Sequence, residues 1–207
     1  KAVENNGDME GQDLSMAFHP YNVLMILVIA SLSVLFLSLS GAFIYSRVTS
    51  DLPPIKLPGI FVFNTLILLG SSGTMYWAKM SYLKDQTRNY QNALLSTILL
   101  SFVFLFMQYL GWKALFQQDI FINSDNSASY LYLISGLHFA HVIGGLPFLG
   151  IFLWSAKKKM KNPVSVLVYF SDPEKKLKLR LLILYWHFLD GLWIYLVLFF
   201  WINYLIH

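Results

Sequence analysis

The sequence predicts an all-α polytopic membrane protein, a bundle of five transmembrane helices. Of its 207 residues, 57% are hydrophobic and only 13% are charged, whereas soluble domains carry about 25% charged residues. Five apolar segments are long enough to cross a bilayer, which takes about 20 residues. The chain has no cysteine, which excludes a disulfide framework and a thiolate metal site.

We expect a polar tail over residues 1–20, which lacks the pattern of a signal peptide, and a single transmembrane domain over residues 21–207. Pro58 opens the second segment, as proline does near a helix N-terminus, and Pro147 is predicted to kink the fourth. Polar loops are expected at 79–92, 117–129 and 157–180. The five predicted spans are about 21–45, 58–78, 93–116, 130–156 and 181–205.

The basic residues predict the orientation. If the tail and the loops 79–92 and 157–180 share one side, that side holds 12 Lys and Arg residues and the other holds three. The positive-inside rule then puts the N-terminus in the cytoplasm and the C-terminus in the periplasm. This distribution explains the pI of 9.2 without nucleic acid as a partner. The basic loop 157–180 is expected to meet anionic headgroups, with an acidic protein partner as the alternative.

Four ionisable side chains fall inside the last two predicted spans. His138 and His141 are three residues apart in the fourth, and His187 and Asp190 are three apart in the fifth, so each pair shares one helix face. Ionisable groups at membrane depth are costly and face protein or a wet cleft. We therefore expect the two pairs to meet in one polar cluster.

Three interpretations of this cluster compete. His138 and His187 have the two-helix placement of axial haem ligands, although the spans contain no Glu for a carboxylate-bridged di-metal site. A proton relay in a small transporter or channel is the second interpretation. The third is structural, with His–Asp and His–backbone hydrogen bonds holding helices in register. We expect the structural role, with no catalytic, cofactor-binding or metal-binding residue in the chain.

Two further sets of residues are predicted to act in packing and lipid contact. Gly136, Ala140 and Gly144 follow one another at four-residue intervals, so another helix backbone is expected to lie close along this stripe. Tryptophan side chains are common at the membrane interface. The predicted lipid contacts are Trp77, Trp186 and Trp193.

Several motifs together resemble subunit III of the haem-copper terminal oxidases. Residues 185–193 (YWHFLDGLW) resemble that family's YWHFxDxxW signature, and residues 136–145 (GLHFAHVIGG) are similar to its GxHxxHVxxG segment. Asn64-Thr65 with Ser71-Ser72 resembles an NT…SS pattern, and residues 108–112 (QYLGW) resemble a Q-x-x-x-[YW] pattern. The resemblance runs through all five spans in order.

This resemblance implies an accessory core subunit of an aerobic respiratory oxidase, in the short five-helix form found in the bacterial cytoplasmic membrane. The family's subunit III carries no haem or copper. It packs against subunit I, which holds the haem-copper centre, while subunit II in some members holds copper. It also stabilises the complex against inactivation, supports proton uptake and holds phospholipids in a cleft, which a neighbouring subunit is expected to complete here.

The same resemblance implies contacts with small subunits and a place in a respiratory supercomplex. The electron donor, cytochrome c or quinol, stays open. Three positions depart from the family pattern, which often has Glu where this chain has Lys84 and Gly111, and a Ser-Glu pair near Ser31-Leu32. Asp190 is then the one carboxylate within the predicted spans, so we expect no carboxylate proton path in this chain.

Overall fold

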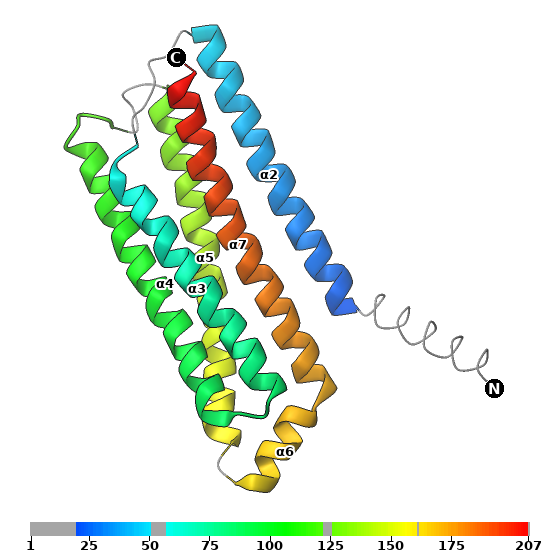
Figure 1. Ribbon diagram of the computed structural model, residues 1–207. Helices are drawn as coiled ribbons and strands as arrows, with labels where there is room; N and C mark the ends of the chain where they lie inside the picture. The colour runs from blue at the N-terminus through cyan, green and yellow to red at the C-terminus, as the bar shows by residue number, and fades with distance from the viewer. Residues whose placement is uncertain (1–19, 51–56, 122–125, 161, 207) are drawn as a thin grey trace.

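The structure is a computed structural model that describes residues 20–50, 57–121, 126–160 and 162–206. Five helices in it are long and apolar enough to cross a membrane, and they stand side by side in one bundle (Figure 1). A short helix, α6, runs across one end. The helices are α2 (Pro20–Ser50), α3 (Gly59–Leu83), α4 (Thr87–Phe116), α5 (Asn126–Lys159), α6 (Pro163–Ser171) and α7 (Pro173–Leu205).

All five predicted spans coincide with helices, but the helices are longer than the spans. The predicted loop 79–92 is wrong for most of its length, because α3 continues to Leu83 and α4 starts at Thr87. The predicted loop 157–180 likewise contains α6 and the first turns of α7. Pro147 lies inside the continuous helix α5. The predicted tail lies outside the described residues up to position 19.

A tight connection joins α3 to α4. Lys84 ends α3, Asp85 has a positive φ of 53°, and the amide of Gln86 donates to the carbonyl of Ser81 at 2.9 Å. This is the six-to-one bond of a Schellman ending, with aspartate at the left-handed position where glycine is commonest. Asp119 takes the same conformation after α4, with a φ of 59°. The short turn makes α3 and α4 an antiparallel hairpin.

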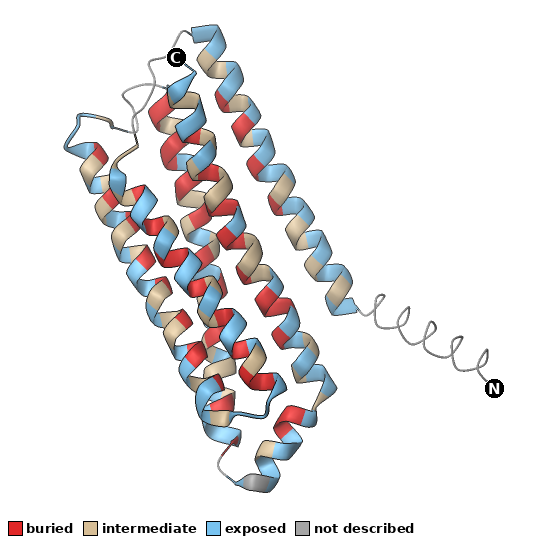
Figure 2. Ribbon diagram, in the orientation of Figure 1, coloured by how far each residue is buried: buried red, intermediate tan, exposed pale blue. Residues whose placement is uncertain are grey.

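The interior is filled along the inner faces of α3, α4, α5 and α7 (Figure 2). One core cluster surrounds Phe104 and Trp193, and a second surrounds Tyr82 and Tyr90 near α6. Helix α2 is bound to the bundle along one stripe, which consists of Leu32, Phe36, Ser40 and Phe43. Much of its remaining surface is exposed apolar side chain, as expected for a helix that faces lipid.

Helix α7 begins with a side-chain cap. The Asp172 side chain accepts hydrogen bonds from the amides of Glu174 and Lys175 at 3.0 and 3.3 Å, which satisfies two amides of the first turn. The Lys175 ammonium group lies 2.6 Å from the same carboxylate. The hydrogen bond from the Lys175 side chain, followed by the backbone amides, lowers the pKa of Asp172 below its ordinary value. These bonds hold the first turn of α7 in helical form.

Candidate functional site

Polar side chains join α3 to α7. The Trp186 indole nitrogen donates to the Ser71 hydroxyl at 3.0 Å, and both side chains are buried. The next serine, Ser72, has its hydroxyl oxygen 2.6 Å from His187 Nδ1. The Asp190 carboxyl group, on a residue only 5% exposed, also faces Ser72. A serine hydroxyl can accept one hydrogen bond and donate another, so Ser72 can serve both partners at once.

His138 forms the polar contact between α5 and α7. It is fully buried, and its Nε2 lies 3.0 Å from the backbone carbonyl of Leu189. A carbonyl only accepts, so Nε2 carries the proton in this bond. The ring also packs edge-on against Phe104 and at a tilt against Trp193. His138 therefore holds the backbone of α7 at a fixed height against α5.

His141 faces a different environment. Its Nδ1 lies 2.6 Å from the carbonyl of Leu137 in its own helix, so this nitrogen donates within α5. The backbone carbonyl of His141 in turn accepts a hydrogen bond from the Tyr185 hydroxyl at 3.0 Å. Tyr185 is thus a further tie between α5 and α7, although the sequence motifs gave it no role. Its place as the first residue of the 185–193 motif is the feature of the sequence that could have indicated this contact.

The expected single cluster of four ionisable residues is therefore divided. His187 and Asp190 turn toward α3, while His138 and His141 bond to backbone carbonyls of α7 and α5. Within the described ranges, no three His, Asp or Glu side chains come together as metal ligands would. The contacts of His138, His187 and Asp190 join helices, whereas that of His141 lies within α5. This geometry does not bring His138 and His187 to a shared ligand.

A second buried polar pair consists of two motif residues whose contact the sequence did not predict. Asn64 of α3 donates through Nδ2 to Oε1 of Gln108 in α4 at 3.0 Å, and both residues are fully buried. Further along the same two helices, the hydroxyls of Thr74 in α3 and Thr97 in α4 lie 2.9 Å apart. Such bonds between side chains are typical interhelical contacts in membranes. The polar positions of α3 thus face α4 and α7 rather than lipid.

The prediction of lipid contact is wrong for two of the three tryptophans. Trp186 and Trp193 are each 1% exposed, Trp186 because its indole bonds to Ser71 and Trp193 because its ring stacks on Phe61 and packs edge-on against Phe104. Tryptophan is common at the membrane interface, but this preference does not say which way a side chain points. The rotation of α7 about its axis turns both rings toward the interior of the bundle. Trp77 is 41% exposed, and its contact with lipid remains a prediction.

No described helix of this chain lies close along the predicted packing stripe, and its contact with a helix of another subunit stays a prediction. Ala140 and Gly144 are exposed, and a Cβ added at Gly136 or Gly144 would meet nothing within 4 Å. The close approach occurs one residue later, at Gly145, where a Cβ would lie 2.8 Å from Cζ3 of Trp186. The stripe therefore faces outward from this chain, and Gly145 is the glycine that lets α5 and α7 meet.

These observations define a class: a polytopic α-helical membrane protein in which motif residues of α5 and α7 form the contacts between helices. The family model for "Cytochrome c oxidase subunit III" matches residues 1–204. The chain belongs to the cytochrome c oxidase subunit III family. The expectation raised by the sequence motifs is thereby confirmed at the level of the family.

Curated relatives agree with this assignment. "Cytochrome c oxidase subunit 3" of Emericella nidulans is 30% identical over 172 residues, which cover 78% of this chain and 59% of the relative. The protein of the same name from Podospora anserina is 30% identical over 187 residues, covering 84% and 64%. That of Salmo salar is 30% identical over 145 residues, covering 70% and 49%. The chain spans about three fifths of the length of the first two relatives.

Proposed function

We propose that this chain is an accessory core subunit of an aerobic respiratory oxidase and itself catalyses no step. It packs against subunit I, whose haem and copper reduce oxygen and drive proton pumping. The observation that carries this proposal is that the signature residues form contacts between helices. His187 and Asp190 both face Ser72, and His138 bonds to the backbone of α7, so these residues hold helices together.

The proposal includes the chain's surroundings. Subunit II, with copper in some oxidases, and small subunits are the further protein partners, within a larger respiratory supercomplex. Phospholipids occupy the exposed apolar faces, with Trp77 among their contacts. The host membrane is the bacterial cytoplasmic membrane. The N-terminal end of α2 faces the cytoplasm and the C-terminal end of α7 faces the periplasm, as the distribution of Lys and Arg supports.

Affinity purification of the tagged chain from its native membrane, in mild detergent, tests this function. A large haem-bearing subunit is expected to copurify and to keep its haem after it is separated from this chain. The composition of the purified complex would also show whether cytochrome c or quinol is the electron donor. Asp190→Asn is expected to lower retention of the chain and leave the haem spectrum of the remaining complex unchanged. Loss of a haem or copper signal on replacing His138, His141 or His187 would contradict the proposal.

The competing function is a small transporter or proton channel built on the His and Asp residues. Purification of the chain alone, colourless and without an oxidase partner, would favour it. Proton uptake by the assembled oxidase provides a second test. Replacing Lys84, which stands where the family often has Glu, is expected to leave uptake unchanged, because we propose no proton path through this chain.

A further inference from the structure

Helix α6 exposes apolar side chains beside a cluster of lysines. Its inner face is buried, with Tyr169 at 2% and Phe170 at 8% exposure, whereas Val164, Leu167 and Val168 on its outer face are 75%, 66% and 63% exposed. These three positions follow the spacing of a single helix face. The end of α5 next to it carries Lys157, Lys158 and Lys159. An apolar face with basic residues at its edge is typical of a helix that lies in the membrane interface.

The depth of this corner can be judged from α7. Trp186 bonds to Ser71 near the midpoint of α3, so it lies close to the middle of the bundle. Pro173 begins α7 13 residues earlier, about 20 Å along the axis at 1.5 Å per residue. The hydrocarbon layer extends only about 15 Å from the bilayer centre. Helix α6, which ends just before Pro173, therefore lies at the level of the phospholipid headgroups.

A hollow of about 450 Å³ opens at this corner. Lys158 and Lys159 come from α5, Lys175 from α7, and Val164 and Val168 from α6. Asn162 and Ser165, at the N-terminal end of α6, complete the polar part of the wall, and the Asn162 side chain caps no amide of that helix. The wall is thus basic and polar on one side and apolar on the other.

The two lysines of α5 are available for an anion. Lys175 is paired with Asp172 at 2.6 Å, but neither Lys158 nor Lys159 has a carboxylate partner among the described residues. The Lys158 ammonium group lies 4.7 Å from the ring centre of Trp154, which is 64% exposed. A cation–π contact of this kind keeps the lysine near the apolar boundary and leaves its remaining donors free.

We propose that this corner binds an anionic phospholipid, with the phosphate at Lys158 and Lys159 and the glycerol and upper acyl chains along Val164 and Val168. The site gives a place and a headgroup to the phospholipid contacts of the proposed function, and it depends on the chain's place in a membrane and not on its place in an oxidase. A zwitterionic lipid places a choline or ethanolamine cation next to the lysines, so the site prefers phosphatidylglycerol to phosphatidylcholine.

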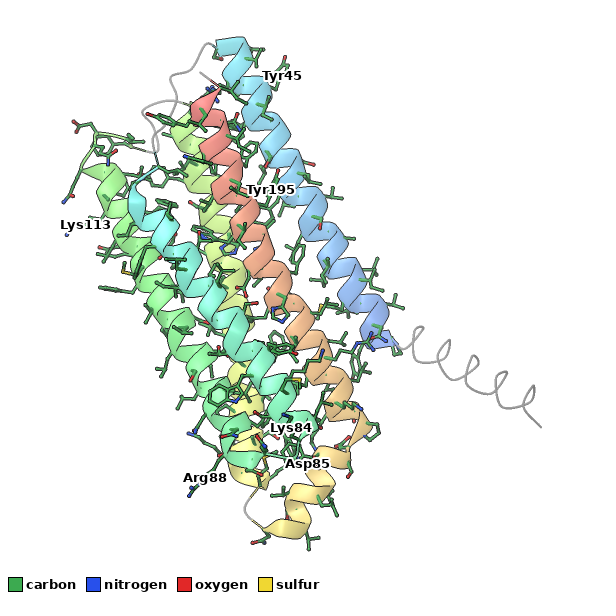
Figure 3. The ribbon with its side chains drawn as sticks, viewed as in Figure 1. Tyr45, Lys84, Asp85, Arg88, Lys113 and Tyr195 are labelled. Carbon is green, nitrogen blue, oxygen red and sulfur yellow. The ribbon has the colours of Figure 1, made fainter. Side chains whose placement is uncertain are left out.

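The test uses the full chain in nanodiscs and counts bound phosphatidylglycerol by native mass spectrometry. The variant K158Q/K159Q removes both free cations. Each lysine near an anionic surface contributes roughly a fivefold gain in affinity, so the variant is expected to bind phosphatidylglycerol about 25-fold more weakly. The control, K84Q/R88Q, removes two exposed cations at the same end of the bundle (Figure 3) that do not line the hollow. It is expected to retain most of the binding.

Four outcomes would overturn the proposal. Equal losses in the two variants would show diffuse attraction to the surface only, and equal binding of phosphatidylglycerol and phosphatidylcholine would show no headgroup selection. Displacement by inorganic phosphate or glycerophosphoglycerol as readily as by the whole lipid would show a soluble-anion site. Unchanged lipid binding by K158Q/K159Q, with loss of copurifying subunits, would assign the lysines to an acidic protein. Copurification is measured separately, so failure of the proposed oxidase function would leave the lipid result intact.

Discussion

The ring of Trp186 lies against the backbone of Gly145, so that a Cβ at this glycine would come within 2.8 Å of Cζ3. The same indole donates to Ser71 on its other helix partner. Trp186 is thus held between α3 and α5, and neither side can move without breaking a contact. This one side chain couples three helices of the bundle.

Gly145→Ala is therefore expected to destabilise the protein. Overpacking a filled interior costs about 1–3 kcal/mol, and here the added methyl group meets a ring that is fixed by its own hydrogen bond. Gly144→Ala is the matched control, because its Cβ meets nothing within 4 Å. Thermal unfolding in detergent should show a lower midpoint for Gly145→Ala alone. Equal midpoints for the two variants would contradict the close approach.

Ser72→Ala is expected to weaken the contact between α3 and α7. The partly buried His187 Nδ1 then loses its partner at 2.6 Å, and the buried Asp190 carboxyl group loses its contact with Ser72. Leaving a buried polar group unpaired costs about 1–3 kcal/mol. Ser33→Ala is the control, since that hydroxyl bonds to the carbonyl of Ile29 in its own helix. Unfolding midpoints of the two variants measure the difference. If Ser33→Ala lowers the unfolding midpoint by the same amount, the stabilising role of the Ser72 contact between α3 and α7 is contradicted.

Arg47→Gln is expected to loosen the junction of α2 and α7. Arg47 Nη1 donates to the backbone carbonyl of Asn203 and to its side-chain oxygen, the latter at 3.1 Å. Hydrogen bonds to charged groups contribute about 1.5–3 kcal/mol, so hydrogen exchange in the last turn of α7 should become at least about tenfold faster. Thr49→Ala, which removes a hydroxyl bonded within α2, should not change it.

The start of α7 is expected to depend on pH. The folded-state pKa of Asp172 is lowered by Lys175 and by the backbone amides, so its stabilising effect is complete above the unfolded pKa of about 3.9 and is lost as the pH falls through the lower folded value. Asp172→Asn keeps a capping oxygen and cannot titrate. The protection of the Glu174 and Lys175 amides from hydrogen exchange, measured relative to an unstructured peptide at the same pH, should fall below about pH 4 in the original chain only. Loss of protection in both proteins would assign the effect to another group.

The sequence predicted the number and place of the spans because the thickness of the hydrocarbon layer sets the length of each apolar segment, and that length can be read from hydropathy. It missed the true helix ends at Leu83 and Thr87, since helices continue into the headgroup region, where polar residues are favourable. It also missed how α5 and α7 are rotated. Spacing puts His187 and Asp190 on one face, but only packing turns that face toward Ser72. The same limitation led to the wrong lipid contacts for Trp186 and Trp193.

The attachment of α2 has a consequence for biosynthesis. Its tie at Arg47 joins residues 156 positions apart, whereas α3 and α4 are neighbours along the chain. During translation α2 is therefore made long before α5 and α7, the two helices against which it packs. It is the most apolar of the five membrane-length helices and has the smallest buried share, which suits a segment that must be stable in lipid by itself. The contacts between α3 and α4 join neighbouring segments, whereas the contacts of α2 with α5 and α7 need helices that are made later.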